Sequence, residues 1–442
     1  GFFNCRNMPS EFNNTPRSGN ADGASVRQSE SSAQSVSGSQ SGRVVVAVSF
    51  GRLVTFMVLL SALGSFVNDM YLPSLPEMVR FFHTSVPMVQ LGLTTGMAGM
   101  IAGQIIFGPV SDKYGRKVVL LWALGLFVVA AVVSVFSPTI HFFLVCRAIQ
   151  GFGVSAAYFL ARSIPADVYG GRQLAKTMAI VGAINGFAPA SAPVIGGFIS
   201  DWLSWKGVFV FLAVYAAAIL CVSGRMKETL PPADRDKGPL LKAFGRYGAL
   251  LRNRRFITHC LFKGTALGVL FAYISSAPFI LQDHYGLSEV TFGLVMGFNA
   301  VFMAVGSMLA LKFSTLRKAA WAGAICLMAS MCCEAAALYC IHSFWVYELF
   351  IVPAVLSMGA IFTVTNTLSM NEGKEDAGSA SAVLGVSGYI FGAIVAPLVG
   401  IGNILHSSAV VYVVMSALTL VMAVLSRRLT PDADMSRQPQ NK

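Results

Sequence analysis

The chain has 442 residues, of which 55% are hydrophobic and only 12% are charged. Soluble domains carry about 25% charged residues, so this composition excludes an ordinary globular enzyme and indicates a membrane protein with many spans. The formal net charge of +12 does not indicate a nucleic-acid partner, because Lys and Arg lie between apolar segments and form no basic stripe interleaved with aromatics.

The first 42 residues are rich in Ser, Gly, Gln and Asn. They lack the large apolar residues that a core needs, so we expect a disordered N-terminal tail over residues 1–42. We find no signal-peptide pattern before the first apolar segment. Met8 is a candidate start, and whether residues 1–7 are native is left open.

Twelve apolar segments follow, and each has the length of a membrane-crossing helix. Helices are expected because a single chain in hydrocarbon must satisfy its own backbone hydrogen bonds, and Gly and Pro are tolerated inside membrane helices. The predicted spans are 53–75, 88–107, 118–136, 142–162, 177–199, 207–223, 256–281, 289–311, 319–341, 344–369, 378–402 and 408–426.

The distribution of Lys and Arg predicts the orientation of these spans. If the N-terminal tail is cytoplasmic, nearly all loop cations are cytoplasmic too, and the segment 224–255 alone holds nine of them. The outer loops then hold only Arg80 and Lys206. Because cytoplasmic loops carry the excess of Lys and Arg, we expect both termini in the cytoplasm.

The charged segment 224–255 separates six spans from six, and the two sets resemble repeats. The sequence APVIG at 192–196 returns as APLVG at 396–400, and Pro73 is followed 205 residues later by Pro278. Related halves predict a substrate site between them near the middle of the membrane, with access that alternates by rocking. The predicted domains are an N-terminal bundle over 43–223, a cytoplasmic linker over 224–255, a C-terminal bundle over 256–426 and a C-terminal tail over 427–442.

The first span contains an acid. Residues 53–68 carry no charge, and Asp69 then appears about seven residues before Pro76. A charge at that depth costs about 2.5–3.5 kcal/mol, so such a residue normally faces a protein interior or a wet cavity. The alternative is a carboxylate at a helix end that reaches interfacial water.

The fourth span contains a guanidinium, Arg147, about 9 Å of helix inside its outer end. Asp69 lies at a similar depth, and pairing or hydrogen bonding would relieve the cost of both charges. A nearby Arg favours the ionised carboxylate, whereas burial disfavours it. A site where these effects compete can load and release a proton, although a permanent structural ion pair is the alternative.

The loop after the second span reads GPVSDKYGRK at residues 108–117. A generic cytoplasmic loop would explain its cations but not the spacing of Gly and Asp. The sequence resembles the GxxxDxxGR[RK] signature of the major facilitator superfamily, with Lys113 in place of the usual Arg. The resemblance implies an all-α membrane protein with twelve transmembrane helices in two six-helix pseudo-repeat bundles. It also implies a conformational latch made by Gly108, Asp112, Gly115, Arg116 and Lys117.

Two further motifs extend the resemblance. RAIQGFG at 147–153 is similar to the RxxQGxG motif that is tied to proton transfer in the antiporters of this superfamily. ASAPVIGG at 190–197 is similar to the antiporter motif of drug exporters and supplies Pro193, Gly196 and Gly197, although Ala188 and Ala192 stand where that pattern has Gly.

Longer strings resemble the Bcr/CflA drug-resistance branch of the twelve-span drug:proton antiporters. They are NDMYLPSLP at 68–76, WLSWKGVF at 202–209 and FAYISSAPFILQDHYGLSEVTFG at 271–293. The resemblance covers about residues 53–426 and is patchier in the second half, where the segment 312–318 lacks the latch pattern.

The resemblance implies a multidrug efflux transporter that exports small amphipathic drugs similar to chloramphenicol and bicyclomycin in exchange for protons by alternating access. Asp69 and Arg147 are the predicted proton-coupling pair. The predicted substrate-binding residues are Asn68, Tyr71, Tyr158, Phe271 and Tyr273, although such aromatics also serve in packing.

The alternatives are a proton-coupled nutrient uptake symporter of the same fold, a membrane-embedded enzyme and a sensor that binds ligand without moving it. We expect no enzyme activity, no cofactor and no metal site, and the HExxH pattern is missing. The expected partners are a small-molecule drug, protons and membrane lipid, with no nucleic acid. We expect a monomer in the plasma membrane, which is the inner membrane of a Gram-negative cell.

Three other charges lie within the spans. Lys263 is expected to extend toward the cytoplasmic interface. Glu334 is a candidate second carboxylate, although we expect it at an interface. Glu348 is near the N-terminal end of its span, where the helix dipole favours an acid. The identity of the drug, the proton stoichiometry and the roles of Lys263 and Glu334 are left open.

Overall fold

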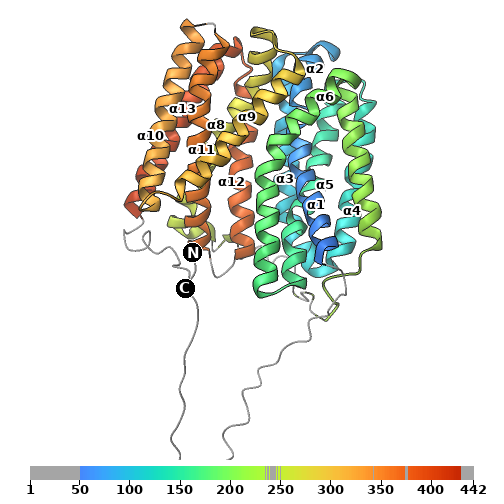
Figure 1. The fold of residues 1–442 in the computed structure, drawn as a ribbon. Helices are drawn as coiled ribbons and strands as arrows, with labels where there is room; N and C mark the ends of the chain where they lie inside the picture. Colours follow the sequence, from blue (N-terminus) through green and yellow to red (C-terminus); the bar gives the residue numbers. More distant parts are fainter. Residues whose placement is uncertain are drawn as a thin grey trace, which may run out of the picture. The chain divides into compact units, whose positions relative to one another are not determined.

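The computed structural model describes residues 50–233, 235, 238, 245, 247–248, 250–341, 343–373 and 377–429. The tail predicted over 1–42, most of that predicted over 427–442 and part of the predicted linker lie outside these residues. Every regular element within the described ranges is a helix (Figure 1). The predicted all-α class is therefore confirmed.

The first half of the chain contains the helices up to the charged segment. They are α1 (Phe50–Asp69), the short 3₁₀ helix η1 (Leu72–Ser74), α2 (Leu75–Phe81), α3 (Val86–Tyr114), α4 (Arg116–Val135), α5 (Ile140–Val168) and α6 (Gly171–Arg225). The element α6 consists of two helices that meet at Ser204, where φ is 60°. The predicted fifth and sixth spans lie on either side of this kink.

The second half repeats this pattern. Its elements are α8 (Arg254–Pro278), the π-helix η2 (Phe279–His284), α9 (Glu289–Ala310), α10 (Leu316–Cys340), α11 (Phe344–Glu372), α12 (Ala377–Leu398) and α13 (Ile404–Leu429). Within the described residues, eleven stretches are long and apolar enough to cross a membrane, and one of them, Phe187–Arg225, extends across the kink at Ser204. Each of the twelve predicted spans therefore coincides with helix over most of its length.

The end of the first span differs from the prediction at the place that bears on the site. The first span was predicted to continue to residue 75, but α1 ends at Asp69 and the chain turns before η1. Pro73 has no N–H to donate to the Asp69 carbonyl four residues earlier, and its ring would clash with that carbonyl, so α1 ends before it. Pro278 lies at the matching place in the second half, where α8 passes into η2.

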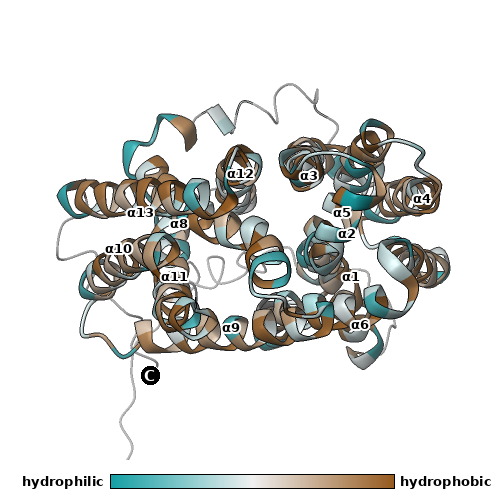
Figure 2. Ribbon diagram, turned by 90° about the horizontal axis from the view of Figure 1, so that it is seen from above, coloured by the Kyte–Doolittle hydropathy of each residue, from teal (hydrophilic) through white to brown (hydrophobic). Residues whose placement is uncertain are grey.

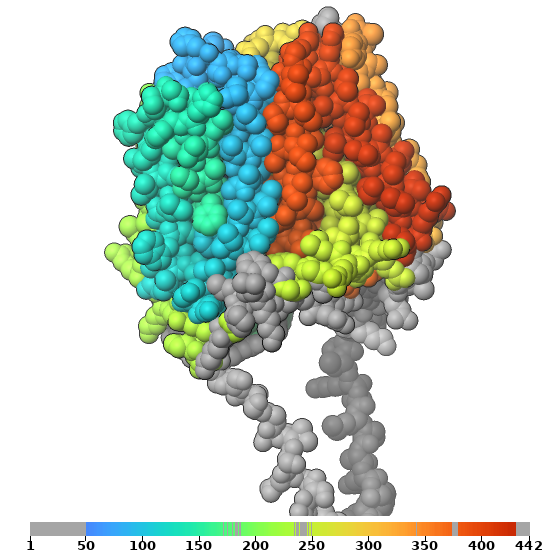
Figure 3. Space-filling view, turned by 180° about the vertical axis from the view of Figure 1, so that it is seen from behind, coloured from blue at the N-terminus to red at the C-terminus, as the bar shows by residue number. Residues whose placement is uncertain are grey.

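The helices form two groups that meet along two seams. Helices α1, α3, α4, α5 and α6 pack on one another, as do α8–α13, and the groups join where α3 packs on α12 and α6 on α9. Figure 2 shows both seams end-on. Figure 3 shows the α3–α12 seam as a continuous line of atoms between the two groups.

The two halves are in contact at the end of the helices where α2 lies, which we call the α2 end. Gln90 Nε2 donates to the Ser275 carbonyl oxygen at 3.0 Å, and Gln282 Nε2 donates to that of Pro73 at 2.8 Å. On the α6–α9 seam, a Cβ on Gly293 would lie 2.5 Å from the Pro193 carbonyl oxygen. Such close backbone approach requires glycine.

Candidate functional site

Asp69 is the last residue of α1, directly before the chain turns toward η1. Its side chain lines a cavity of about 60 Å³ between the two groups of helices, together with Pro189 and Pro193 from α6 and Tyr273 and Asn299 from α8 and α9. This volume holds a few water molecules. No hydrogen bond or ion pair of the Asp69 carboxylate occurs among the described residues, so the acid faces the cavity without a fixed partner.

Arg147 is fully buried in α5 and is held by neutral groups. Its Nη1 donates to Gln150 Oε1 at 2.9 Å and its Nε to the Gly92 carbonyl oxygen at 3.3 Å. Its Cζ lies 4.5 Å from the centroid of the Tyr71 ring, a cation–π contact. Gly96 makes room for the guanidinium, because a Cβ there would lie 3.0 Å from Nη2.

Asp69 and Arg147 interact electrostatically, but no ion pair joins them within the described ranges. The cost of burying the Arg147 charge is therefore offset by hydrogen bonds to neutral groups rather than by an ion pair with Asp69. Gln150 is fixed in turn, since its Nε2 donates to the Ala130 carbonyl oxygen at 3.2 Å and to Ser134 Oγ at 3.1 Å. Arg147 thus lies in a preformed polar pocket next to the helix that carries Asp69.

The five residues predicted to bind substrate lie in different surroundings. Tyr273 lines the cavity. Asn68 and Tyr71 are buried in the first group of helices, where Asn68 Nδ2 lies 3.2 Å from Met100 Sδ. Tyr158 Oη accepts from Arg162 Nη2 at 2.8 Å, and Phe271 packs against Tyr389 with ring centroids 6.3 Å apart.

Asn299 is a cavity residue that sequence reasoning missed. Its Nδ2 donates to Tyr273 Oη at 2.9 Å and to Glu348 Oε2 at 3.0 Å. The only sequence signal was a lone amide within the apolar run of α9. Glu348 lies in the second turn of α11, and this hydrogen bond connects it to the cavity wall.

The expectation for Glu334 was wrong. This residue was expected at an interface, but it has no exposed surface. The reason is that α11 and α13 both pack on α10 and cover the face that carries it. Lys263, expected to extend toward the cytoplasmic interface, is half-buried in α8.

The predicted latch lies where α3 meets α4. Gly115 has φ 101°, a conformation that favours glycine, and α4 starts at the next residue. Arg116 forms ion pairs with Asp112 at 2.6 Å and with Asp167 of α5 at 3.0 Å. The cationic side chain thus ties the end of α3 to the end of α5.

A carboxylate from beyond α6 completes this corner. Glu228 Oε1 accepts from the backbone N–H of Arg116 at 2.9 Å, at the positive end of the α4 dipole. Lys117 Nζ donates to the Gly224 carbonyl oxygen at 2.8 Å. Gly108 lies close to Tyr247, which also follows α6. Among the described residues, the hydrogen bonds and ion pairs of the predicted latch stay within the first half and the segment that follows it.

The predicted antiporter motif lies on the α6–α9 seam. Gly197 faces the carbonyl oxygen of Glu289, and Gly293 faces that of Pro193. Gly196 faces the carbonyl of Met70, next to Asp69. These residues therefore let α6 approach both the other half and the turn that follows Asp69.

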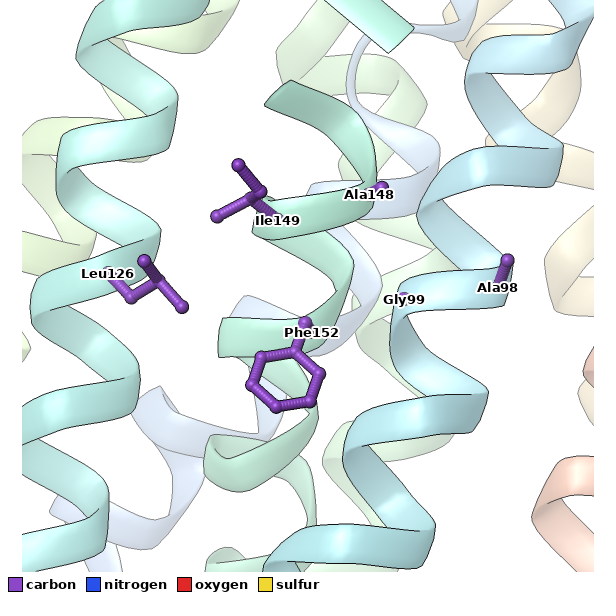
Figure 4. Close-up of a pocket in the computed structure, with 6 residues that line it drawn as sticks. All are labelled: Ala98, Gly99, Leu126, Ala148, Ile149 and Phe152. Atoms are coloured by element: carbon purple, nitrogen blue, oxygen red, sulfur yellow. The ribbon is translucent and has the colours of Figure 1, made fainter. Parts of the chain in front are cut away.

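A larger groove of about 430 Å³ lies on an outer face of the first half, between α3, α4 and α5. Figure 4 shows the side chains of Leu126, Ile149 and Phe152 around it, with Ala98, Gly99 and Ala148 at the α3–α5 contact. All six residues are apolar or glycine, so the groove provides no polar group to orient a ligand.

The model of the Major Facilitator Superfamily matches residues 54–397. The MFS-type transporter YdgK of Bacillus subtilis is 35% identical over 359 residues, which cover 79% of this chain and 89% of that relative. Multidrug resistance protein D of Escherichia coli is 26% identical over 341 residues, covering 75% and 84%. A chloramphenicol resistance protein of Pseudomonas aeruginosa is 30% identical over 246 residues, covering 55% and 57%.

The fold is also similar to that of a solved structure. The xylose transporter XylE of E. coli, in a partially occluded inward open conformation, matches with a TM-score of 0.68 at 16% identity. The match covers 87% of this chain and 100% of that one. The chain therefore belongs to the major facilitator superfamily. It is an integral membrane protein and a secondary transporter of small molecules, in a family of transporters rather than enzymes.

Proposed function

We propose that this transporter is a drug:proton antiporter of the Bcr/CflA type that exports small amphipathic drugs such as chloramphenicol. Two relatives support this proposal by their names, a chloramphenicol resistance protein at 30% identity and multidrug resistance protein D at 26%. The string NDMYLPSLP, which carries Asp69, gives the branch assignment its sequence support.

The observation that carries the proposal is the position of Asp69. Its carboxylate is the acid that lines the cavity between the two halves, and no fixed cation neutralises it. A group in such a place can take a proton from water on one side and lose it on the other. Arg147, which contacts the ring of Tyr71 two residues beyond Asp69, supplies a positive charge near the acid without forming an ion pair with it.

The transport cycle follows from charge. With a proton on Asp69 the cavity is neutral, and the halves can close around it at low cost. Drug entry from the cytoplasm favours release of the proton to that side, and proton entry from outside favours release of the drug. One charge crossing about 100 mV supplies about 2.3 kcal/mol. This energy sustains a drug gradient of nearly fiftyfold, since about 1.4 kcal/mol corresponds to tenfold.

Several assignments belong to this proposal. Both termini lie in the cytoplasm, so the α2 end is the outer end, and the bundles extend over 43–223 and 256–426 with a linker at 224–255. Gly108, Asp112, Gly115, Arg116 and Lys117 act as the conformational latch, and Pro193, Gly196 and Gly197 as the antiporter motif. Asn68, Tyr71, Tyr158, Phe271 and Tyr273 contact the drug during the cycle, and the transporter acts as a monomer.

The first test compares Asp69→Asn with Asp201→Asn in cells exposed to chloramphenicol. Asp201 is an exposed acid of α6 and provides a matched control for the loss of a carboxylate. Both variants should insert into the membrane equally, and only Asp69→Asn should lose resistance to the level of cells without the transporter. Unchanged resistance in Asp69→Asn would remove this acid from the mechanism.

The second test determines the direction of coupling. Chloramphenicol added to everted vesicles with an acidic lumen should release protons from the lumen if drug and proton move in opposite directions. A nutrient symporter gives no release with the drug, and a sensor gives none with any ligand. Absence of release with the wild-type protein, in vesicles that hold a stable gradient, would contradict antiport.

A further inference from the structure

A pair of acids lies within the second half, apart from Asp69. Glu334 of α10 has no exposed surface, and neither of its carboxylate oxygens has a hydrogen-bond partner among the described residues. Glu348 of α11 is half-buried, with its Oε1 buried and without a hydrogen-bond partner among the described residues, and it is close enough to interact with Glu334 electrostatically. Glu334 lies six residues before Cys340 and Glu348 four residues after Phe344, so their depths are about 9 and 6 Å of helix from the same end.

The groups around this pair supply no positive charge. Tyr347 of α11, Tyr412 of α13 and Tyr273 of α8 interact with the acids, and Tyr412 Oη shares a hydrogen bond of 2.7 Å with Ser276 Oγ. Burial raises the pKa of Tyr285, beyond η2, to about 12, so this phenol is neutral at physiological pH. Within the described ranges no Lys, Arg or His acts on Glu334.

Two ionised carboxylates in such a place are unfavourable. An ionised Glu334 would be a buried charge with no opposite charge to compensate it, and a second negative charge on Glu348 would repel it. One proton on the pair removes the repulsion and leaves a single negative charge to be stabilised. The geometry therefore favours a pair of carboxyl groups that hold one proton between them.

The pair is connected to the transport cavity. Asn299 and Tyr273 both line the cavity that Asp69 lines. Asn299 Nδ2 donates to Glu348 Oε2 at 3.0 Å and to Tyr273 Oη at 2.9 Å, while its Oδ1 is buried without a partner among the described residues. Asn299 is therefore the single residue between the acids and the cavity. Its free oxygen can accept a hydrogen bond from a water molecule there.

We propose that Glu334 and Glu348 form a second proton-binding site, which exchanges one proton with water of the cavity past Asn299. When the proton leaves to cavity water, the pair gains one negative charge, and when it returns that charge is lost. The transporter thus has one titrating site in each half, Asp69 in the first and the Glu334–Glu348 pair in the second. This inference does not depend on the identity of the cargo or on antiport.

The experiment uses infrared difference spectra of the full-length protein in lipid, recorded between acidic and alkaline buffer. The signal is the C=O stretching band of a protonated carboxylic acid. All variants carry Asp69→Asn, so Asp69 contributes nothing to the band. Glu334→Gln and Glu348→Gln are each added to this background, and Glu372→Gln is the matched control, since Glu372 pairs with Arg255 at 3.9 Å at the far end of α11.

We expect the Asp69→Asn protein to keep a titrating carboxylic acid band. Either Glu334→Gln or Glu348→Gln should remove or strongly shift this band, and Glu372→Gln should leave it unchanged. The proposal is overturned if Asp69→Asn alone abolishes the band, or if the band survives both substitutions in the pair. If Glu334→Gln does not yield folded protein, the band in Glu348→Gln alone tests the proposal. This variant should fold, because the glutamine oxygen can still accept the hydrogen bond from Asn299 Nδ2.

The two proposals fail in different ways. Resistance in Asp69→Asn cells tests the coupling role of Asp69, whereas the band in Asp69→Asn protein tests the second site. Lost resistance with no remaining band leaves the antiporter proposal intact and removes the second site. Retained resistance, with a band that disappears in Glu334→Gln, supports the second site and contradicts the coupling role of Asp69.

Discussion

The guanidinium of Arg147 lies over the ring of Tyr71, with its Cζ 4.5 Å from the ring centroid. Arg147 projects from α5 and Tyr71 lies in the turn after α1, two residues beyond Asp69. The contact therefore holds the turn that directly follows Asp69 against α5. Loss of the guanidinium should therefore change the position of the Asp69 carboxylate, even though Asp69 and Arg147 form no ion pair within the described residues.

Arg147→Lys should show this dependence. A lysine keeps the positive charge, but a single ammonium cannot donate to Gln150 and Gly92 while it also stacks on Tyr71. Loss of one hydrogen bond from a charged donor costs about 1.5–3 kcal/mol, and we expect transport to be lost with it. Unfolding in detergent and a resistance assay measure the two effects. In Arg80→Lys, a change in an exposed ion pair with Asp283, stability should stay within about 0.5 kcal/mol. Wild-type stability in Arg147→Lys would show that the hydrogen bonds of Arg147 are dispensable.

Gly115→Ala should destabilise the corner between α3 and α4. The residue has φ 101°, and an added Cβ would also meet the carboxylate of Glu228, which caps α4. Backbone strain of this kind costs about 1–3 kcal/mol. The control is Gly125→Ala inside α4, where a Cβ meets nothing within 4 Å and should stabilise by about 0.5–1 kcal/mol. The melting temperatures of the two variants should move in opposite directions, and a shared direction would contradict the strain argument.

The sequence was sufficient for the fold because membrane spans follow from the length of apolar runs, which is a local property. It also singled out Asp69 and Arg147, since a charge within an apolar run is visible without any knowledge of tertiary contacts, and their proton-coupling role stays a prediction. The end of α1 was misplaced by six residues because the apolar run continues through Leu72 and Leu75, although Pro73 interrupts the helix.

Tertiary contacts decided the rest of the candidate site. The depth of Glu334 along its helix agrees with an interface, and only the packing of α11 and α13 on α10 shows that its face is covered. Likewise, Glu228 follows α6 along the chain but caps α4. The two partners, Arg116 and Glu228, are 112 residues apart in sequence, so no local pattern predicts their hydrogen bond. Asn299 was missed because one amide in an apolar run carries little information until its partners Tyr273 and Glu348 are known.

Ser204→Gly should stabilise the kink inside α6. Ser204 has φ 60° and ψ 179°, a region that is almost restricted to glycine and costs a side chain about 1–3 kcal/mol. The next residue, Trp205, donates its backbone N–H to Glu77 Oε2 at 2.9 Å, so the kink is held from outside and should survive the substitution. We expect a higher melting temperature in detergent. The same change at Ser223, in helical conformation, should lower it, because glycine costs about 0.5–1 kcal/mol in a helix. A lower melting temperature for Ser204→Gly would argue against strain at the kink.

Gly293→Ala should open the α6–α9 seam at the α2 end. An added Cβ would lie 2.5 Å from the carbonyl oxygen of Pro193, and this clash involves backbone, so no side-chain rotation relieves it. Overpacking costs about 1–3 kcal/mol, which shifts a conformational equilibrium about 5- to 150-fold. A cysteine pair at Arg80 and Asp283, whose charged groups lie 3.6 Å apart across the two halves, reports closure through a bifunctional crosslinker. Crosslinking should fall at least severalfold in Gly293→Ala, and transport should be lost. Gly51→Ala is the control, because a Cβ there meets nothing within 4 Å. Equal crosslinking in both variants would mean that close backbone contact at Gly293 is not needed for closure.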